Sequence, residues 1–200
     1  MSNTDRRTAL LDAAVEEIAR GGTRGLRVDA VAKVAGVSTA LIYHHFGDRS
    51  TLLQSALEHI GTRADNYTTP SEATGCEMVI EMLLGEIQDE PAVRTNSAAW
   101  GELRGEATFA TSLRPVITGL TDRWVSDIAA YIRDGVTDGS IRSAADPLDV
   151  AVQLTALVEG LSSRWLTDQL TAAHARSHLV SAATALLGND RSVQLPEPML

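Results

Sequence analysis

The sequence lacks several features that mark common classes of protein. It has one cysteine, Cys76, among 200 residues. A single thiol excludes an intramolecular disulfide framework and a zinc cluster built on cysteines, and we expect Cys76 to pack as a small hydrophobic side chain. The apolar stretches are short and interrupted by charges, so none is long enough to cross a bilayer. The N-terminal residues carry acidic groups where a secretion signal needs an apolar run, which predicts a cytoplasmic protein.

Signatures of catalysis are also absent. The chain has no glycine-rich phosphate loop, no His and carboxylate pair at metal-binding spacing and no nucleophile motif. The adjacent Ser162 and Ser163 lie inside a helical pattern rather than on a sharp turn. We therefore expect neither an enzyme nor a bound metal or cofactor.

The composition is that of an ordinary folded protein, but the charge is unevenly distributed. Hydrophobic residues make up 44% and charged residues 22%, as in typical globular domains. The net charge is −9. Residues 1–60 are neutral, with seven basic and seven acidic side chains, whereas residues 61–200 carry ten and nineteen. This asymmetry predicts two modules with different partners.

Almost the whole chain has the pattern of helices. Apolar residues recur at steps of three and four, and no long alternating strand pattern occurs. Asp146 followed by Pro147 is a strong helix start, and Pro115 predicts either a kink or a fresh helix start. We expect an all-α fold of about nine helices, at about residues 4–20, 28–35, 39–45, 49–66, 72–89, 92–103, 107–137, 147–170 and 173–187.

We expect these helices to form two domains. The helical pattern breaks in the segment TRADNYTTPSEATG, which places a module boundary near residues 61–70. We assign residues 1–48 to a head of three helices. The fourth helix connects this head to a larger helical domain of residues 49–190, and residues 191–200 have the composition of a flexible tail.

Residues 28–46, VDAVAKVAGVSTALIYHHF, meet the requirements of a helix-turn-helix. Ala32 is small enough for the close crossing of two helices, and Gly36 can adopt the positive φ of a tight turn. Ser38 is a natural N-cap for the second helix. The apolar residues that would lock the two helices together are Val31, Val37 and Ile42. A plain helical hairpin would meet only some of these requirements.

Residues 6–60 resemble the DNA-binding domain of the TetR family of bacterial regulators. The resemblance rests on the stretches LLDAAVEEIARGG and VAKVAGVSTALIYHHFGDRSTLL. Two positions depart from the family pattern, because Ala40 replaces the usual Gly and Arg27 replaces a capping Thr or Ser. The segments AAWGELRGEATFATSLRPVI and ALVEGLSSRWL are similar, more distantly, to the sensor domain of the BetI-like subgroup. The residues that match the family pattern at the end of the recognition helix are Tyr43, His45, Phe46, Gly47, Asp48 and Arg49.

The second helix of the motif would enter the major groove and present its N-terminal and exposed side chains to base edges. It carries no Arg or Lys, so the common Arg–guanine contact is not available from it. Basic residues that flank the helix would contact phosphates and fix the register. His45 either contacts DNA or packs against Phe46. The candidate DNA-contact residues are Arg27, Val28, Lys33, Ser38, Thr39, Ala40, Tyr43, His44, His45 and Arg49.

A head with no net charge neutralises few phosphates, so one copy should bind DNA weakly. A homodimer on a palindromic site solves this problem, because a two-fold protein matches a two-fold site. The apolar faces of the last two helices could form a four-helix bundle between subunits, which the family resemblance favours. Alternatively, these faces only close the core of the monomer. The candidate interface residues are Leu154, Leu157, Val158, Leu161, Trp165, Leu179, Ala182 and Leu186.

The helices between about residues 72 and 137 should enclose a pocket for a small-molecule effector. An aromatic wall with a buried Glu would suit a cationic ligand, whereas Arg104 would suit a carboxylate. Alternatively, the aromatic residues belong to the core. The candidate pocket residues are Glu81, Trp100, Arg104, Phe109, Trp124 and Tyr131.

Together these features predict a DNA-binding transcriptional regulator that responds to a ligand. The resemblance implies a repressor that binds a palindromic operator as a homodimer and is released by a small-molecule effector, although activation is not excluded. We expect the ligand to favour a conformation whose two heads are spaced wrongly for the operator, with the fourth helix as the lever. The alternative is a helical small-molecule-binding protein of the same fold with weak or lost DNA binding.

Overall fold

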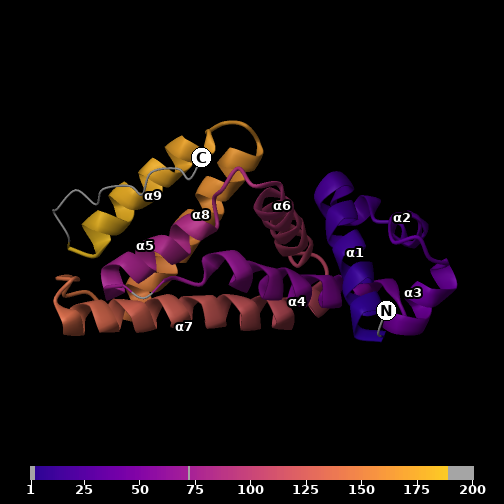
Figure 1. The fold of residues 1–200 in the computed structure, drawn as a ribbon, viewed down its shortest axis with the longest axis horizontal. Coiled ribbons are helices and arrows are strands. Elements are labelled where there is room, and N and C mark those ends of the chain that lie inside the picture. Colours follow the sequence, from indigo (N-terminus) through magenta and orange to yellow (C-terminus); the bar gives the residue numbers. More distant parts are fainter. Residues whose placement is uncertain (1–2, 72, 189–200) are drawn as a thin grey trace. The chain divides into compact units, whose positions relative to one another are not determined.

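The computed structural model describes residues 3–71 and 73–188, and the tail expected at 191–200 lies outside them. Throughout the described residues the regular structure is helical, as the sequence predicts (Figure 1). Within the same ranges no helix is both long and apolar enough to cross a membrane. The elements in chain order are α1 (Asn3–Gly25), α2 (Val28–Val34), α3 (Thr39–Phe46), α4 (Arg49–Thr68), α5 (Gly75–Gly85), α6 (Pro91–Glu106), the 3-10 turn η1 (Thr111–Leu113), α7 (Arg114–Asp138), α8 (Pro147–Leu166) and α9 (Ala172–Leu186).

Two helix starts that the sequence singled out are present. Asp146 caps α8, because its carboxylate accepts from two backbone N–H groups of the first turn, at 2.8 and 3.4 Å. Pro115 belongs to a fresh start rather than to a kink. Residues 107–109 form a turn, η1 follows, and α7 begins at Arg114. Of the two alternatives left open for Pro115, the fresh start is confirmed, and the long helix expected from about residue 107 begins at Arg114.

The end of α1 differs from the expectation, whereas the end of α4 agrees with it. α1 is interrupted at Gly22, whose φ of 71° is not helical, but helical residues continue to Gly25. α4 ends at Thr68, within the pattern break at residues 61–70 and two residues beyond the predicted end near residue 66. A long-range contact supports this extension, because the hydroxyl of Tyr67 in the last turn accepts a hydrogen bond from α6.

α5 is shorter than the helix predicted at about residues 72–89. It begins after Thr74, whose hydroxyl accepts from the backbone N–H of Glu77 at 3.4 Å. In return, the Glu77 carboxylate accepts from the backbone N–H of Thr74 at 3.0 Å. This capping box satisfies two backbone donors and fixes the first turn of the helix at Gly75.

The chain divides into two compact units. The first comprises Met1–Tyr67 and Asp89–Asp122, and the second comprises Thr68–Gln88 and Arg123–Leu200. The first unit thus contains α6 and the first turns of α7 as well as α1 to α4. The first change of unit along the chain, between Tyr67 and Thr68, falls within the module boundary expected near residues 61–70. The assignment of functional domains, with a head of residues 1–48, stays a prediction.

The core of the first unit is built around α1. Leu10, Ala14 and Ile18, at helical spacing, are almost completely buried. They belong to one cluster with buried residues of α2, α3, α4 and α6. α6 therefore shares the core of the helices that the sequence assigns to the head.

The second unit has its own core, formed by α5, α8, α9 and the later part of α7. Trp165 of α8 is 1% exposed. Cys76 is buried in the same core, which confirms that it packs as a hydrophobic side chain. Arg176 of α9 donates to the carbonyls of Leu84 and Ile87 at 2.7 and 3.0 Å, and burial lowers the pKa of its guanidinium. These bonds satisfy carbonyls at and just beyond the C-terminal end of α5.

Candidate nucleic-acid interface

The connection between α2 and α3 has the geometry that its sequence predicts. Gly36 adopts a φ of 67°, in the left-handed region. The backbone N–H of Val37 donates to the carbonyl of Ala32 at 2.9 Å, which closes the end of α2. Ser38 then starts α3, because its hydroxyl accepts from the backbone N–H of Leu41 at 3.4 Å. The two helices therefore form the expected helix-turn-helix.

One face of α3 anchors the helix in the core of the first unit. Ile42 and Phe46 are 1% and 4% exposed. Arg7 of α1 holds its guanidinium 5.1 Å from the centre of the Phe46 ring. The same guanidinium donates to the hydroxyl of Ser55 on α4 at 3.0 Å. Arg7 thus links α3 to its two supporting helices.

The opposite face of α3 is open to solvent. Thr39, Ala40, Tyr43 and His44 are exposed, and Tyr43 is 51% exposed. Their hydroxyl, imidazole and methyl groups are of the kinds that contact base edges, phosphates and thymine methyl groups. Because the helix is fixed from behind by Ile42, this face could enter a major groove without local unfolding.

The three basic residues that flank α3 differ in exposure and in their hydrogen-bond and ion-pair partners. Lys33 is exposed and has no ion-pair partner among the described residues. Arg27 directs its guanidinium at Asp29, with contacts of 3.1 and 2.9 Å, and this hydrogen-bonded pairing lowers the pKa of Asp29. Arg49 is half-buried and donates to the backbone carbonyl of Thr23. A phosphate would compete with these partners at both arginines, but not at Lys33.

Two further candidate contact residues are half-buried. The ring of His45 lies 6.1 Å from the ring of Phe46 and 5.7 Å from that of His44, measured between ring centres. Val28, the first residue of α2, packs against the core of the first unit. Each of these two side chains is partly covered by its neighbours, and the remaining surface of each is exposed to solvent.

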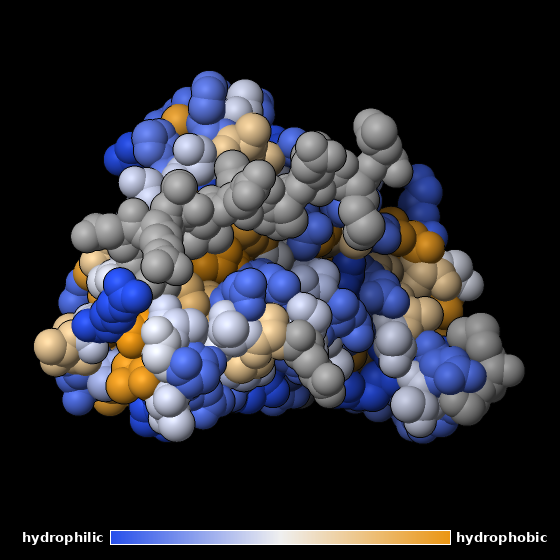
Figure 2. Space-filling model, turned by 60° about the vertical axis from the view of Figure 1, so that its left-hand side comes forward, coloured by the Kyte–Doolittle hydropathy of each residue, from blue (hydrophilic) through white to orange (hydrophobic). Residues whose placement is uncertain are grey.

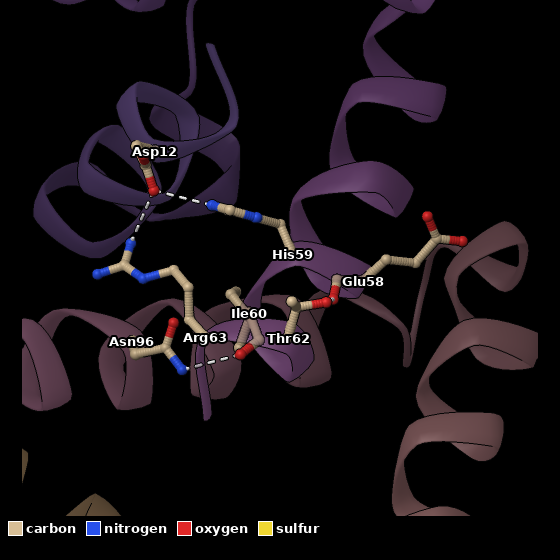
Figure 3. A network of polar contacts seen from close by, with 7 residues as sticks. All are labelled: Asp12, Glu58, His59, Ile60, Thr62, Arg63 and Asn96. Atoms are coloured by element: carbon tan, nitrogen blue, oxygen red, sulfur yellow. Dashed lines mark hydrogen bonds and ion pairs between the residues drawn. The ribbon is translucent and has the colours of Figure 1, made fainter. Parts of the chain in front are cut away.

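Polar contacts join α4, which follows the motif, to α1 and α6 (Figure 3). His59 Nε2 donates to the Asp12 carboxylate at 2.8 Å, and Arg63 lies 3.6 Å from the same oxygen. Asn96 of α6 is 2% exposed, and its amide donates to the carbonyl of Ile60 at 3.1 Å. The position of α4 is therefore fixed by charged or hydrogen-bonded contacts as well as by apolar packing.

Sequence reasoning does not identify these supporting residues. Arg7, Asp12 and Asn96 act through partners that are 29 to 51 positions away along the chain. No local motif connects such pairs. The only available signal is at Asn96, a polar residue at helical spacing from the buried Val93 and Ala99.

The predicted pocket residues are divided between the two units. In the first unit Trp100 is half-buried against the core, whereas Arg104 and Phe109 are exposed. The side chain of Phe109 is 73% exposed. The guanidinium of Arg24 lies 5.9 Å from the centre of its ring. Phe109 is therefore a surface aromatic residue rather than a core residue.

In the second unit, Glu81 is not the buried carboxylate that a cation pocket was expected to contain. It is exposed, and it accepts from the backbone N–H and the hydroxyl of Ser71 at 2.8 to 3.0 Å. The expectation of a buried Glu at this position is wrong, because Glu81 lies on the solvent face of α5 and secures the segment before that helix.

The two aromatic candidates on α7 lie in the second unit and pack against its core. Trp124 and Tyr131 are both half-buried. They are seven residues apart, which places them on one face of the helix. The indole Nε1 of Trp124 is buried and has no hydrogen-bond acceptor among the described residues. A buried donor of this kind is costly unless a ligand or a water supplies an acceptor.

The predicted interface residues of α8 and α9 mostly face inward. Buried in the core of the second unit are Leu154, Val158, Leu161, Trp165 and Leu179, and half-buried are Leu157, Ala182 and Leu186. The monomer core therefore accounts for the five buried residues, as the alternative from the sequence proposed. Leu148 and Val152 of α8, by contrast, are each 51% exposed. Figure 2 shows one face of the molecule, on which hydrophobic residues reach the surface at separate places among hydrophilic ones.

Comparisons with known proteins match both parts of the chain. Residues 10–56 match the family described as bacterial regulatory proteins of the tetR family. Residues 77–188 match the C-terminal domain of BetI-type transcriptional repressors. The HTH-type transcriptional regulator BetI of Burkholderia mallei is 28% identical over 96% of this chain and 94% of its own length. That of Rhizobium meliloti is 27% identical over 80% and 77%.

Solved structures agree with these matches. A Rhodococcus protein assigned to the TetR family of transcriptional regulators has a TM-score of 0.86 at 45% identity, and the match covers 92% of this chain and 99% of that one. A regulator from Saccharomonospora viridis, whose crystal structure is in complex with choline, has a TM-score of 0.78 at 27% identity, over 89% and 94% of the two chains. The chain is thus a member of the TetR family of transcriptional regulators, with a DNA-binding helix-turn-helix and a ligand-binding C-terminal domain of the BetI type.

Proposed function

We propose that this protein is a cytoplasmic repressor that binds a palindromic operator as a homodimer and leaves it when a small-molecule effector binds. The observation that carries the DNA-binding part is the two-sided character of α3. Ile42 and Phe46 are buried behind it, while Thr39, Tyr43 and His44 are exposed in front. A helix held in this way can read base edges in a major groove.

The electrostatics of the head favour binding by two copies. Of the three flanking basic residues, Lys33 has no partner among the described residues, and Arg27 and Arg49 are engaged with Asp29 and Thr23. A single head therefore offers few free positive charges to phosphates, and affinity depends on the number of phosphates neutralised. Two heads on two half-sites double that number and match the symmetry of a palindrome.

The exposed side of α8 is the surface that we assign to dimer formation. Leu148, Val152, Ala156 and Gly160 follow each other at intervals of four residues and are all exposed. A β-carbon on Gly160 would meet no atom of the described residues within 4 Å. Glycine inside a helix lowers helix stability by about 1 kcal/mol relative to alanine. Close packing of a second subunit against this position would explain why it has no side chain. This face replaces the inward-facing residues named from the sequence.

For the effector, choline is the first molecule to test, because the Saccharomonospora viridis regulator binds it. Trp124 supplies two suitable groups. The face of an indole ring attracts a quaternary ammonium. The buried Nε1–H has no acceptor among the described residues, and the hydroxyl of choline could provide one. Arg104, which would suit a carboxylate effector, is exposed and lies in the other unit.

The test is a selection on random double-stranded DNA at two salt concentrations, followed by titration of the bound DNA with choline. We expect an enriched palindrome and affinity that falls with salt. Tyr43→Ala should weaken binding to that palindrome by about tenfold, whereas the exposed control Glu16→Ala on α1 should not. Absence of any enriched sequence, at both salt concentrations, would favour a small-molecule-binding protein that has lost DNA binding.

The effector is tested separately. Choline should release the wild-type protein from the selected DNA, and Trp124→Phe, which keeps a ring but removes the N–H donor, should require about tenfold more choline. Release of wild type and variant at equal concentrations would remove Trp124 from the effector site. No release by choline would require a different effector without affecting the DNA-binding proposal.

A further inference from the structure

A surface pocket of about 260 Å³ lies in the first unit, between the C-terminal end of α1 and α6. It shares no residue with the DNA-contact candidates. Of the predicted effector-pocket residues it contains only Phe109. The lining residues are Gly21, Gly22, Thr23, Arg24, Gly101, Glu102, Gly105, Glu106 and Phe109.

Glycines create the space in this pocket. Gly101 and Gly105 are one helical turn apart on α6, and Gly21 faces them from the end of α1. A β-carbon at any of these three positions would meet no atom of the described residues within 4 Å. The packing of these residues therefore does not require glycine there, although glycine inside a helix is less stable than alanine. The consequence is a bare backbone wall that side chains would otherwise fill.

Two opposite charges border the pocket without being paired. Glu102 and Arg24 have no hydrogen-bond or ion-pair partner among the described residues. A Glu102 carboxylate oxygen lies 2.7 Å from the place that a β-carbon on Gly22 would occupy, so the carboxylate is held against the end of α1. Glu106 differs, because it already accepts from the hydroxyl of Thr23 at 3.1 Å.

An aromatic ring completes the site. Phe109 is 73% exposed, and its one ring contact among the described residues is with the Arg24 guanidinium, 5.9 Å from the ring centre. A cation over an aromatic ring at a solvent-exposed site is held only weakly. The guanidinium can therefore turn toward an anion without a large loss, which leaves the ring free for another cation.

We propose that this pocket binds a small zwitterion that carries an ammonium and a carboxylate group. The ammonium would lie against the Glu102 carboxylate and the Phe109 ring, and the carboxylate against the Arg24 guanidinium. A ligand with only a negative charge would be repelled by Glu102 and Glu106, and a ligand with only a positive charge would be repelled by Arg24. A molecule with both charges satisfies all of these groups and connects α1 of the head to α6. This inference does not depend on the identity of the effector.

The experiment is a titration of the full-length protein, without zwitterionic buffer, followed by the amide signals of Gly21, Gly22, Gly101 and Gly105 in a two-dimensional NMR spectrum. The probes are glycine, β-alanine and 4-aminobutanoate, with butanoate and butylammonium as single-charge analogues. At least one amino acid should shift these signals with a saturable curve, and the analogues should do so at least about tenfold more weakly.

Variants then assign the charges. Glu102→Gln and Arg24→Gln should each raise the Kd of the best amino acid by about tenfold, and Gly105→Leu should abolish the shifts by filling the pocket. Glu58→Gln, which changes the same charge on an exposed part of α4, should leave the Kd unchanged. The proposal is overturned if no amino acid shifts the glycine signals, if the analogues bind equally well, or if Glu102→Gln and Glu58→Gln behave alike.

Discussion

At Gly75 the backbone of α5 comes closer to α7 than any side chain would allow. A β-carbon at this position would lie 2.1 Å from the backbone nitrogen of Gly135 and 2.5 Å from the carbonyl oxygen of Tyr131. These are backbone atoms of a helix, so they cannot rotate out of the way as the end of a long side chain can. The close crossing of the two helices therefore depends on a missing side chain.

We predict that Gly75→Ala lowers the free energy of unfolding by about 2–3 kcal/mol, because the overpacked helices must move apart. Denaturant titration followed by circular dichroism measures this difference. The control is Gly119→Ala on α7, the helix that Gly75 contacts, where a β-carbon would meet no atom of the described residues within 4 Å. It should be neutral or should stabilise by up to about 1 kcal/mol. Equal effects of the two substitutions would contradict the close crossing.

Single carboxylates at helix ends should make the stability depend on pH. The backbone N–H of Gly75 donates to Asp138 at 2.8 Å and lowers the pKa of that carboxyl below its usual range. A backbone N–H from Thr51 has the same effect on the pKa of Asp48. A group whose pKa is lowered by folding contributes stability above its unfolded pKa, and this contribution is lost as pH falls through the folded pKa.

The prediction concerns Asp138→Asn. At neutral pH the variant should melt at a lower temperature than the wild type, because a neutral amide is a weaker acceptor for the Gly75 N–H. The difference should shrink from about pH 4 downward, as the wild-type carboxyl becomes protonated. Melting temperatures measured between pH 7 and pH 3 provide the test. A difference that stays constant over this range would show that the charge of Asp138 does not contribute.

At the scale of the elements, Asn96 connects α4 and α6, two helices of the first unit. Its amide group, on α6, donates to the Ile60 carbonyl at 3.1 Å and to the Tyr67 hydroxyl at 2.7 Å, both on α4. α4 directly follows the helix-turn-helix. A displacement of α6 would therefore be transmitted through these two hydrogen bonds to α4. This pair of bonds is a physical connection on which an effector signal could act.

Asn96→Asp should destabilise the protein by about 3 kcal/mol or more at neutral pH, because it removes both donors and buries a negative charge against a carbonyl oxygen. The loss should become smaller as pH falls, since burial raises the pKa of the new carboxyl and protonation removes its charge. Tyr67→Phe, which removes only one acceptor, should cost about 1 kcal/mol. Chemical denaturation of both variants at pH 7 and pH 5 distinguishes these outcomes. A pH-independent loss for Asn96→Asp would argue against a buried charge.

At the scale of the whole molecule, net charge and DNA binding can be reconciled only through the distribution of charge. The chain carries −9 overall, but residues 1–60 are neutral. The acidic excess thus lies in the part that does not contain the helix-turn-helix. Dimer formation through α8 would double the number of heads on one DNA without requiring either head to be strongly basic.

Val152→Glu should convert the dimer into a monomer, because two copies of the new charge would meet at the two-fold axis of the α8 interface. Sedimentation measures the mass, and the affinity for the selected palindrome should fall by at least about a hundredfold. Val136→Glu on α7 is the matched control, since Val136 is 49% exposed and Val152 is 51% exposed. It should leave the mass and the affinity unchanged. A dimeric Val152→Glu variant would exclude this face as the interface.

Features that depend on neighbouring residues could be predicted from the amino-acid sequence alone. The turn at Gly36, the cap at Ser38 and the start of α8 at Asp146 each use hydrogen bonds between residues no more than five positions apart. Local hydrogen bonds of this kind and the spacing of apolar residues can both be recognised in the amino-acid sequence. They were sufficient to predict the helical fold and the motif that carries its resemblance to DNA-binding regulators.

Which side chains remain exposed and unpaired depends instead on the packing of the folded chain. In the sequence, Leu154 and Trp165 have the apolar spacing that an interface helix would also have. In the structure both are buried in the core of their own unit. Arg49 looks like a free cation, but it binds the carbonyl of Thr23, 26 positions away. The pocket between α1 and α6 likewise joins segments about 80 positions apart. Burial and pairing depend on contacts between residues distant along the chain, and no local pattern in the sequence specifies them.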